Sequence, residues 1–306
     1  ADDLTLSLFE NQYPVQPMGV SYNSYLILDE KVAVMDSVDA RAADEWLAKL
    51  AHELDGRSPD YLVISHMEPD HSGSILRLAE KYQEMKLVGN AKTFTMLRQF
   101  FGAKAPTDDR LLEVGEGETL PLGAHTLHFM LAPMVHWPEV MVAYEETEKI
   151  LFSADAFGRF GALSRTAAAP WAPQARRYYY NIVGKYGAQV QALLKKAAAL
   201  EIETICPLHG PVLTGGALAE ALRLYDLWSR WQSEAPEEIL LAHASIHGNT
   251  ARAAELLKQK LEAKGARVTL CDLTTTEVSY AVANAFYCGK LVLACSTYDG
   301  GLFPPM

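Results

Sequence analysis

The stretch YLVISHMEPDHSGS, residues 61–74, joins a short apolar run to a group of histidines and acids. The run Tyr61–Ile64 predicts a short buried strand. The loop after it carries four groups that can bind metals: His66, Glu68, Asp70 and His71. In an extended backbone, side chains two residues apart share a face, so the first three would converge and His71 would point to the other side. This convergence favours a metal site over a solvated polar loop.

Polar residues at 72–74 and the apolar pattern of Ile75–Met85 predict a helix directly after the ligand loop. One loop cannot supply all the ligands of two metals, so further ligands must come from elsewhere in the chain. Three candidates each stand at the end of an apolar segment: His136, Asp155 and His209. Because α/β folds gather functional groups where strands give way to loops, we predict a site built from several separate elements.

Four motifs, in chain order, carry a resemblance to a known family: H-x-E-x-D-H at 66–71, H-W-P at 136–138, S-x-D-x-F-G at 153–158 and C-P-x-H-G-P at 206–211. Together they resemble the metallo-β-lactamase-like domain of the flavodiiron proteins, also called A-type flavoproteins. The resemblance implies a diiron site with the following ligands: His66, Glu68 and His136 for one iron, Asp70, His71 and His209 for the other, and Asp155 as the bridge.

Glu68 separates this chain from the zinc hydrolases of the same fold. Those hydrolases, such as glyoxalase II and the lactonases, carry H-x-H-x-D-H, with a second histidine where this chain has a glutamate. A carboxylate makes the site harder and more anionic, which favours iron or manganese over zinc. A binuclear zinc hydrolase that cleaves thiolesters or lactones stays as the alternative function. A second alternative is an electron carrier whose metal site is vestigial.

Composition describes an ordinary globular protein, with 306 residues of which 49% are hydrophobic, enough for roughly two domains. The net charge of −11 argues against nucleic acid or an anionic membrane as a partner. No segment approaches the roughly 18 consecutive apolar residues of a membrane helix, and a cytoplasmic location is predicted. The cysteines form no C-x-x-C pair and are interpreted as buried free thiols.

Residues 1–236 are predicted to form an αββα sandwich of the metallo-β-lactamase-like class, because strand and helix candidates recur in two halves. Asp36 follows the strand candidate Lys31–Met35 and is interpreted as a helix cap or loop residue rather than as a ligand. The tyrosines at 178–180 and Trp137 are interpreted as core packing. The resemblance places the tyrosine run close to the metals, and leaves open which tyrosine approaches them.

A polar linker at 232–237 precedes a second predicted domain, 237–306, with the pattern strand–helix–strand–helix–strand. Its first loop sets hydroxyls and a glycine between a strand and a helix N-terminus, an arrangement typical of an anion site. The pattern resembles the start of a flavodoxin-like, doubly wound domain. That resemblance implies FMN, held at its phosphate by Ser245, His247, Gly248, Asn249 and Thr250 and flanked at its isoalloxazine ring by Ser296, Thr297, Tyr298, Asp299, Gly300 and Gly301.

A flavodoxin-like domain has five strands, whereas this sequence stops at Met306, in the loop after the third. We expect the sequence to be a fragment or an incomplete record of a longer protein. An unpaired third strand would otherwise be an open edge, and flavin binding would be doubtful.

The two resemblances together imply an oxidoreductase that uses FMN and two iron ions. It would reduce dioxygen to water, nitric oxide to nitrous oxide, or both, in detoxification. They also imply a head-to-tail homodimer or a dimer of dimers. The electron donor would be a protein such as rubredoxin, or a reduced deazaflavin. The choice between the two oxidants depends on packing around the metals, and the sequence leaves it open.

Overall fold

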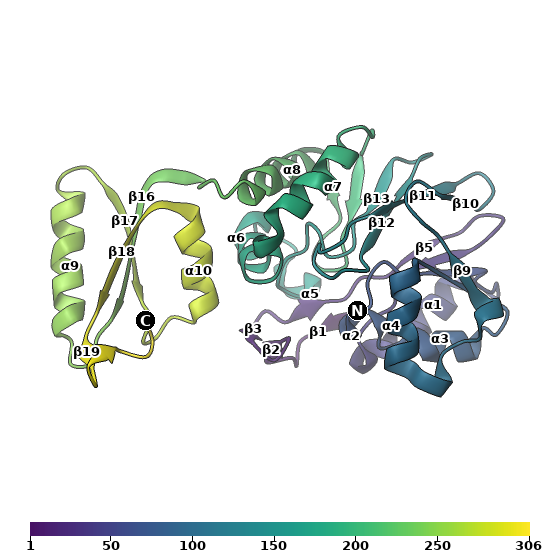
Figure 1. Cartoon of the computed structure of the whole chain (residues 1–306), viewed down its shortest axis with the longest axis horizontal. Coiled ribbons are helices and arrows are strands. Elements are labelled where there is room, and N and C mark those ends of the chain that lie inside the picture. Colours follow the sequence, from purple (N-terminus) through teal and green to yellow (C-terminus); the bar gives the residue numbers. More distant parts are fainter.

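Two β-sheets face each other in the first part of the chain (Figure 1); the computed structural model describes residues 1–306. The five-stranded sheet has the order β5-β6-β7-β8-β9, formed by Tyr25–Ile27, Ala33–Met35, Tyr61–Val63, Lys86–Gly89 and Leu111–Glu113. The six-stranded sheet runs β10-β11-β12-β13-β14-β15, formed by Thr119–Pro121, Thr126–Leu131, Met141–Glu145, Ile150–Phe152, Thr204–Cys206 and Leu213–Thr214.

Alternation along the short strands builds two layers of core. Ala33 and Met35 of β6 pack between the two sheets, whereas Val34 faces the helices. In β12, likewise, Met141 packs between the two sheets and Val142 faces the helices. Because every strand near the centre is apolar on both faces, both faces must be covered.

Helices cover the outer face of each sheet (Figure 1). The larger helices are α1 (Ala43–Leu54), α3 (Ile75–Lys81), α4 (Ala91–Phe101), α6 (Trp171–Tyr178), α7 (Gly187–Ala197) and α8 (Gly215–Ser229). In α1, residues Trp46, Leu50 and Leu54 recur every four positions and are buried together in the main core. The predicted αββα sandwich is confirmed.

Shorter elements complete the first part. Strand β2 (Leu8–Phe9) forms a hairpin with β3 (Tyr13–Pro14), and β1 (Asp2–Asp3) pairs with β4 (Val20–Ser21). The short helices are η1 (Ala40–Ala42), α2 (Pro69–Ser72), η2 (Gly102–Lys104), η3 (Asp108–Arg110), α5 (Leu163–Thr166) and η5 (Gly184–Tyr186). The segment η4 (Tyr179–Val183) is a π-helix that continues α6.

A second, smaller sheet forms a separate body (Figure 1). Its three parallel strands have the order β17-β16-β18, formed by Arg267–Asp272, Ala235–Ala244 and Cys288–Cys295. Helix α9 (Asn249–Glu262) covers one face, and α10 (Val278–Tyr287) packs between the other face and the first body. A short hairpin, β19 (Thr297–Tyr298) with β20 (Gly301–Leu302), follows β18. This is the doubly wound arrangement that the sequence predicts.

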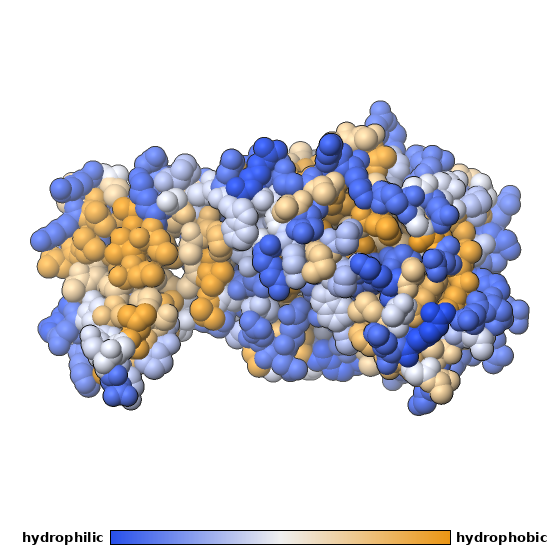
Figure 2. All heavy atoms as spheres, viewed as in Figure 1, coloured by the Kyte–Doolittle hydropathy of each residue, from blue (hydrophilic) through white to orange (hydrophobic).

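One detail differs from the sequence-based expectations. Strand β16 begins at Ala235, so half of the predicted linker 232–237 belongs to the sheet; the domain boundary at 236/237 stays a prediction. On the edge strand β18, Leu291 and Leu293 are exposed, and Figure 2 shows apolar atoms gathered over this body. None of the helices combines the length and apolar composition that crossing a membrane requires.

Candidate metal centre

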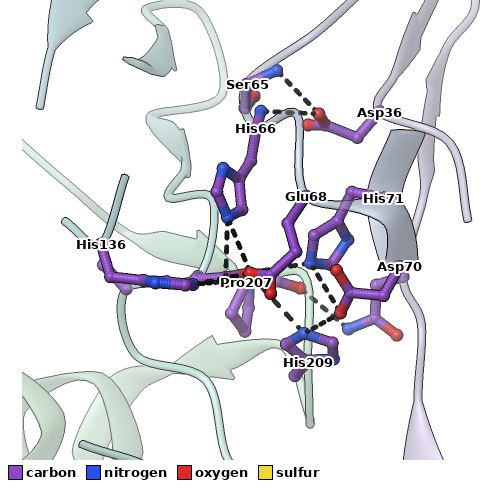
Figure 3. A network of polar contacts seen from close by, with 12 residues as sticks. Asp36, Ser65, His66, Glu68, Asp70, His71, His136, Pro207 and His209 are labelled. Carbon is purple, nitrogen blue, oxygen red and sulfur yellow. Dashed lines mark hydrogen bonds and ion pairs between the residues drawn. The ribbon is translucent and has the colours of Figure 1, made fainter. Parts of the chain in front are cut away.

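All seven predicted ligands converge from separate parts of the chain. Figure 3 labels all of them except Asp155. His66 follows β7, Asp155 follows β13 and His209 follows β14, while His136 lies in the loop between β11 and β12. The remaining three, Glu68, Asp70 and His71, lie at or inside the short helix α2. Except for partly exposed Glu68 and Asp70, these side chains are buried.

The ligand atoms form two groups. In the first, Glu68 Oε2 lies 3.2 Å from His66 Nε2 and 3.0 Å from His136 Nε2. In the second, Asp70 Oδ2 lies 3.3 Å from His71 Nε2 and 3.2 Å from His209 Nε2. Atoms at these separations can surround a point about 2 Å from each, which is the usual bond length from a metal ion to nitrogen or oxygen.

Asp155 connects the two groups through its two oxygens. Its Oδ2 atom lies 3.1 Å from His136 Nε2 in the first group. Its Oδ1 atom lies 3.1 Å from His71 Nε2 in the second. One carboxylate that presents a separate oxygen to each group has the geometry of a bridging ligand.

Unpartnered polar atoms indicate that the cluster is built for cations. Although some of them lie close to one another, the buried atoms that make no hydrogen bond include both carboxylate oxygens of Asp70, Oδ1 of Asp155, and Nε2 of His71 and His209. Leaving such atoms unpaired costs about 1–3 kcal/mol each. Bound metal ions would satisfy them, so the residues fit a binuclear metal site.

The electrostatics of the cluster match this interpretation. Burial alone would lower the pKa of His136, but its hydrogen bonds to Asp155 and Glu68 more than offset it and raise the pKa to about 9. Burial likewise opposes ionisation of Asp155, yet the charge of His71 and the hydrogen bond from His136 hold the pKa of Asp155 well below its usual value. Asp155 therefore stays ionised, as a carboxylate that binds a metal must be.

The predicted direction of His71 is wrong. An extended backbone would turn it away from Asp70, but Pro69 begins the helical turn α2, which brings both side chains into the site. Proline favours the first position of a helix because its φ angle is already helical and its missing N–H is not needed there. The alternation argument therefore holds only as far as Glu68.

Two buried carboxylates behind the ligand loop hold its shape. Asp36 accepts hydrogen bonds from the backbone N–H groups of Ser65 at 2.7 Å and His66 at 3.3 Å (Figure 3). It is a loop residue that bonds no imidazole, as predicted. Glu139, which the sequence analysis did not single out, accepts hydrogen bonds from the His66 ring and from Met67 N. Its position three residues after His136, before an apolar strand, was the available signal.

Further contacts fix the loop that carries His209. The amide of Asn23 donates to the carbonyl oxygens of Pro207 and Gly210, both at 2.8 Å. The hydroxyl of Tyr25 donates to the Pro207 carbonyl at 2.7 Å. These residues lie at the start of the opposite sheet, so the site depends on both sheets together.

Backbone strain surrounds Asp155. Ala154 and Phe157 have positive φ angles of 51° and 67°, a left-handed conformation that is uncommon outside glycine. Such strain costs on the order of 1–3 kcal/mol per residue and concentrates at functional sites. The Phe157 N–H bonds the hydroxyl of buried Tyr225 at 2.6 Å, which helps to hold this turn.

A pocket of about 750 Å³ opens onto the cluster. Besides ligands, it is lined by Glu10, Arg41, Trp137, Lys185 and Tyr186. Desolvation, followed by the negative charge of Glu68, raises the pKa of Glu10 to about 7. Sequence reasoning missed Glu10, because it lies far from every motif.

The tyrosine run packs in the core, as predicted, and all three rings are buried. Tyr178 is the one that approaches the site, with its ring 5.6 Å from that of His209. Tyr180 instead stacks on Phe286 of the second body at 4.2 Å. Trp137 is only partly buried, lies against the main core and lines the pocket.

The loops predicted to bind FMN meet at the carboxyl ends of β16 and β18. Thr250 Oγ1 lies 3.0 Å from Ser296 Oγ. Gly248, with φ of 82°, precedes α9, whose first N–H groups have no side-chain cap, and the buried Ser245 Oγ has no partner. His247 and Asn249 are exposed, and Asn249 is the first residue of α9. The last five predicted residues, Thr297, Tyr298, Asp299, Gly300 and Gly301, form the exposed β19–β20 hairpin. The first loop fits an anion such as a phosphate.

The fold and the site define a binuclear metalloprotein with a metallo-β-lactamase-like sandwich and a flavodoxin-like sheet. A family model described as "ODP family beta lactamase" matches residues 20–210. The rubredoxin-oxygen oxidoreductase of Megalodesulfovibrio gigas is 30% identical, with 95% of this chain and 73% of that protein covered. The nitric oxide reductase of Moorella thermoacetica is 27% identical, with 94% and 72% covered.

Solved structures agree with the sequence comparisons. The flavodiiron protein of Giardia intestinalis matches with a TM-score of 0.91 and 28% identity, over 99% of this chain and 74% of that one. Rubredoxin oxygen:oxidoreductase from Desulfovibrio gigas matches with a TM-score of 0.90 and 29% identity, over 100% and 77%. The chain belongs to the flavodiiron proteins, which confirms the resemblance drawn from the four motifs.

Proposed function

We propose that this chain is an oxidoreductase that reduces dioxygen to water, nitric oxide to nitrous oxide, or both, with two irons and FMN. The observation that carries the proposal is the pair of ligand groups joined by Asp155, with the carboxylate of Glu68 where zinc hydrolases have a histidine. Relatives named as an oxygen oxidoreductase and as a nitric oxide reductase support it.

Each group of residues has a defined part in this proposal. His66, Glu68 and His136 would hold one iron, Asp70, His71 and His209 the other, and Asp155 would bridge them. Ser245, His247, Gly248, Asn249 and Thr250 would hold the FMN phosphate, and residues 296–301 would flank its ring. When bound, the iron pair and the reduced flavin supply the electrons that either reduction consumes.

The protein itself supplies positioning. Each iron would have two imidazoles, one terminal carboxylate and a shared carboxylate, which leaves room for a small ligand on the side of the pocket. The rings of Trp137 and Tyr178 lie beside the ligand imidazoles, 5.2 Å from the ring of His66 and 5.6 Å from that of His209. Glu10 lines the same pocket. Its pKa is raised to about 7, so its carboxyl group can exchange a proton near neutral pH.

Partners and location follow the same proposal. The metal cluster and the loops for FMN lie in separate bodies of one chain (Figure 1), which supports a head-to-tail homodimer, or a dimer of dimers, that brings the flavin of one copy to the metals of the other. The pocket of about 750 Å³ is far larger than either diatomic oxidant requires.

Rubredoxin, or a reduced deazaflavin, would be the electron donor, and a cytoplasmic location stays a prediction of the sequence.

Metal and flavin content, measured on protein purified without oxygen, tests the proposal first. We expect about two irons and about one FMN per chain, and consumption of dioxygen or nitric oxide when a reductant is added. His209→Ala should abolish that consumption. Bound zinc without flavin, together with cleavage of a thiolester, would instead support the hydrolase. Electron transfer that survives in His209→Ala would support the carrier.

A further inference from the structure

The two ligand groups differ in what lies behind their histidines. In all four imidazoles, Nε2 faces the cluster, so Nδ1 is available to the surrounding protein. The Nδ1 atom of His66 hydrogen-bonds Glu139 Oε1 at 2.7 Å, and both side chains are completely buried. His209 Nδ1 instead donates to the neutral carbonyl of Ser21 at 2.8 Å. The Nδ1 atom of His71 has no hydrogen-bond partner.

We propose that Glu139 makes the metal position of His66, Glu68 and His136 the tighter of the two. The inference rests on the proposed metal pair. A carboxylate that accepts the N–H of an imidazole fixes its tautomer and strengthens its other nitrogen as a donor. Each group has one terminal carboxylate and shares Asp155, so the direct ligands are balanced in charge. Glu139 adds a negative charge behind a histidine of the first group only, so the two positions differ.

Glu139 is held in place independently of any metal. Its Oε1 atom also accepts from Met67 N at 2.8 Å. Its backbone carbonyl accepts from the amide of Asn90 at 2.6 Å, and Asn90 in turn caps helix α4. The carboxylate is therefore held in place by contacts within the protein, as a preorganised site requires.

The other buried carboxylate nearby does not cancel this difference. Asp36 directs its oxygen to the backbone N–H groups of Ser65 and His66 and bonds no ring nitrogen. It shapes the loop and, unlike Glu139, accepts no hydrogen bond from an imidazole. The asymmetry of the two positions thus depends on one side chain.

Glu139→Gln tests the charge with little change in shape. The second oxygen of Glu139 has no partner, so an amide nitrogen can replace it while Oε1 still accepts from His66 and Met67. Metal-free full-length protein is titrated with Co²⁺ against a coloured chelator. The wild type should bind two ions in unequal steps, and Glu139→Gln should weaken the tighter step about 10–100-fold and leave the other unchanged.

Glu145→Gln is the matched control. Glu145 is equally buried, but it accepts only from the backbone N–H groups of Thr147 and Glu148 in the turn after β12. Both binding steps should match those of the wild type. Folding of each variant is checked by thermal unfolding.

Single-ligand variants identify the positions even if Glu139→Gln does not fold. His66→Ala should remove the tighter step, and His209→Ala the weaker one. In the His66→Ala background, adding Glu139→Gln should change nothing further. The reverse order of steps, or normal Co²⁺ binding by folded Glu139→Gln, would overturn the inference. Failure of the wild type to bind two ions would contradict the proposed function instead.

Discussion

At the scale of single residues, the site depends on Asp155, the one side chain that contacts both groups of metal ligands. Asp155 presents one oxygen to His136 and the other to His71, each at 3.1 Å. No other residue among the seven ligands is shared in this way. Its strained flanking residues, Ala154 and Phe157, show that the surrounding structure forces this turn on the chain.

Asp155→Asn tests the shared ligand. An amide lacks the charge of the carboxylate, and its nitrogen cannot bind a metal, so both positions should lose affinity. Metal at about 1,000 times its dissociation constant stabilises the native state by about 4 kcal/mol. A chelator should therefore lower the melting temperature of the wild type but scarcely that of Asp155→Asn. Asp226→Asn, at an exposed carboxylate, is the control and should respond like the wild type.

At the scale of elements, strand ends were predictable and contacts across the sandwich were not. The apolar run Tyr61–Ile64 predicts β7 and the start of the ligand loop, because strand patterns are local. Glu139 meets His66 from 73 residues away, and no local pattern encodes that contact. The short helix α2 depends on Pro69 overriding the alternation that precedes it. The sequence therefore predicts which residues gather, but not the groups that hold them.

Turns also join the two sheets at a distance from the metals. Asp29, in the turn between β5 and β6, accepts from both the backbone N–H and the ring of His125, each at 2.7 Å. His125 lies in the turn between β10 and β11, and its hydrogen bond to Asp29 is the main cause that raises its pKa. This contact connects the edges of the sandwich.

We expect this contact to make stability depend on pH. A histidine whose pKa is raised by folding stabilises the native state most below its unfolded pKa, about 6.5. That contribution is lost as pH rises through the higher folded value. The gap in melting temperature between the wild type and His125→Asn should therefore shrink from pH 6 to pH 9. A gap that stays constant would contradict the ionic contribution; His52→Asn, at an exposed helical site, is the control.

At the scale of the whole molecule, the second body packs against the first through helix α10. Arg177 of α6 is completely buried. It donates to Ser279 Oγ at 2.6 Å and to the Pro14 carbonyl at 2.7 Å, and its guanidinium lies 4.0 Å from the ring centre of Tyr280. One side chain therefore joins helix α10 of the second body to the hairpin β2–β3, which borders the pocket beside the ligand cluster.

Arg177→Met should separate the two bodies without disturbing the metal ligands. Removing the arginine leaves its buried hydrogen-bond partners unpaired, which costs about 1–3 kcal/mol for each such group. Here the cost should lie near the lower end, since Met keeps the apolar contact with Phe160. Thermal unfolding should split into two transitions, and protease should cut sooner around residues 230–236. Arg230→Met, at an exposed arginine that pairs with Asp226, should do neither. A single transition at the wild-type temperature would mean that the stack of Tyr180 on Phe286 suffices to hold the bodies together.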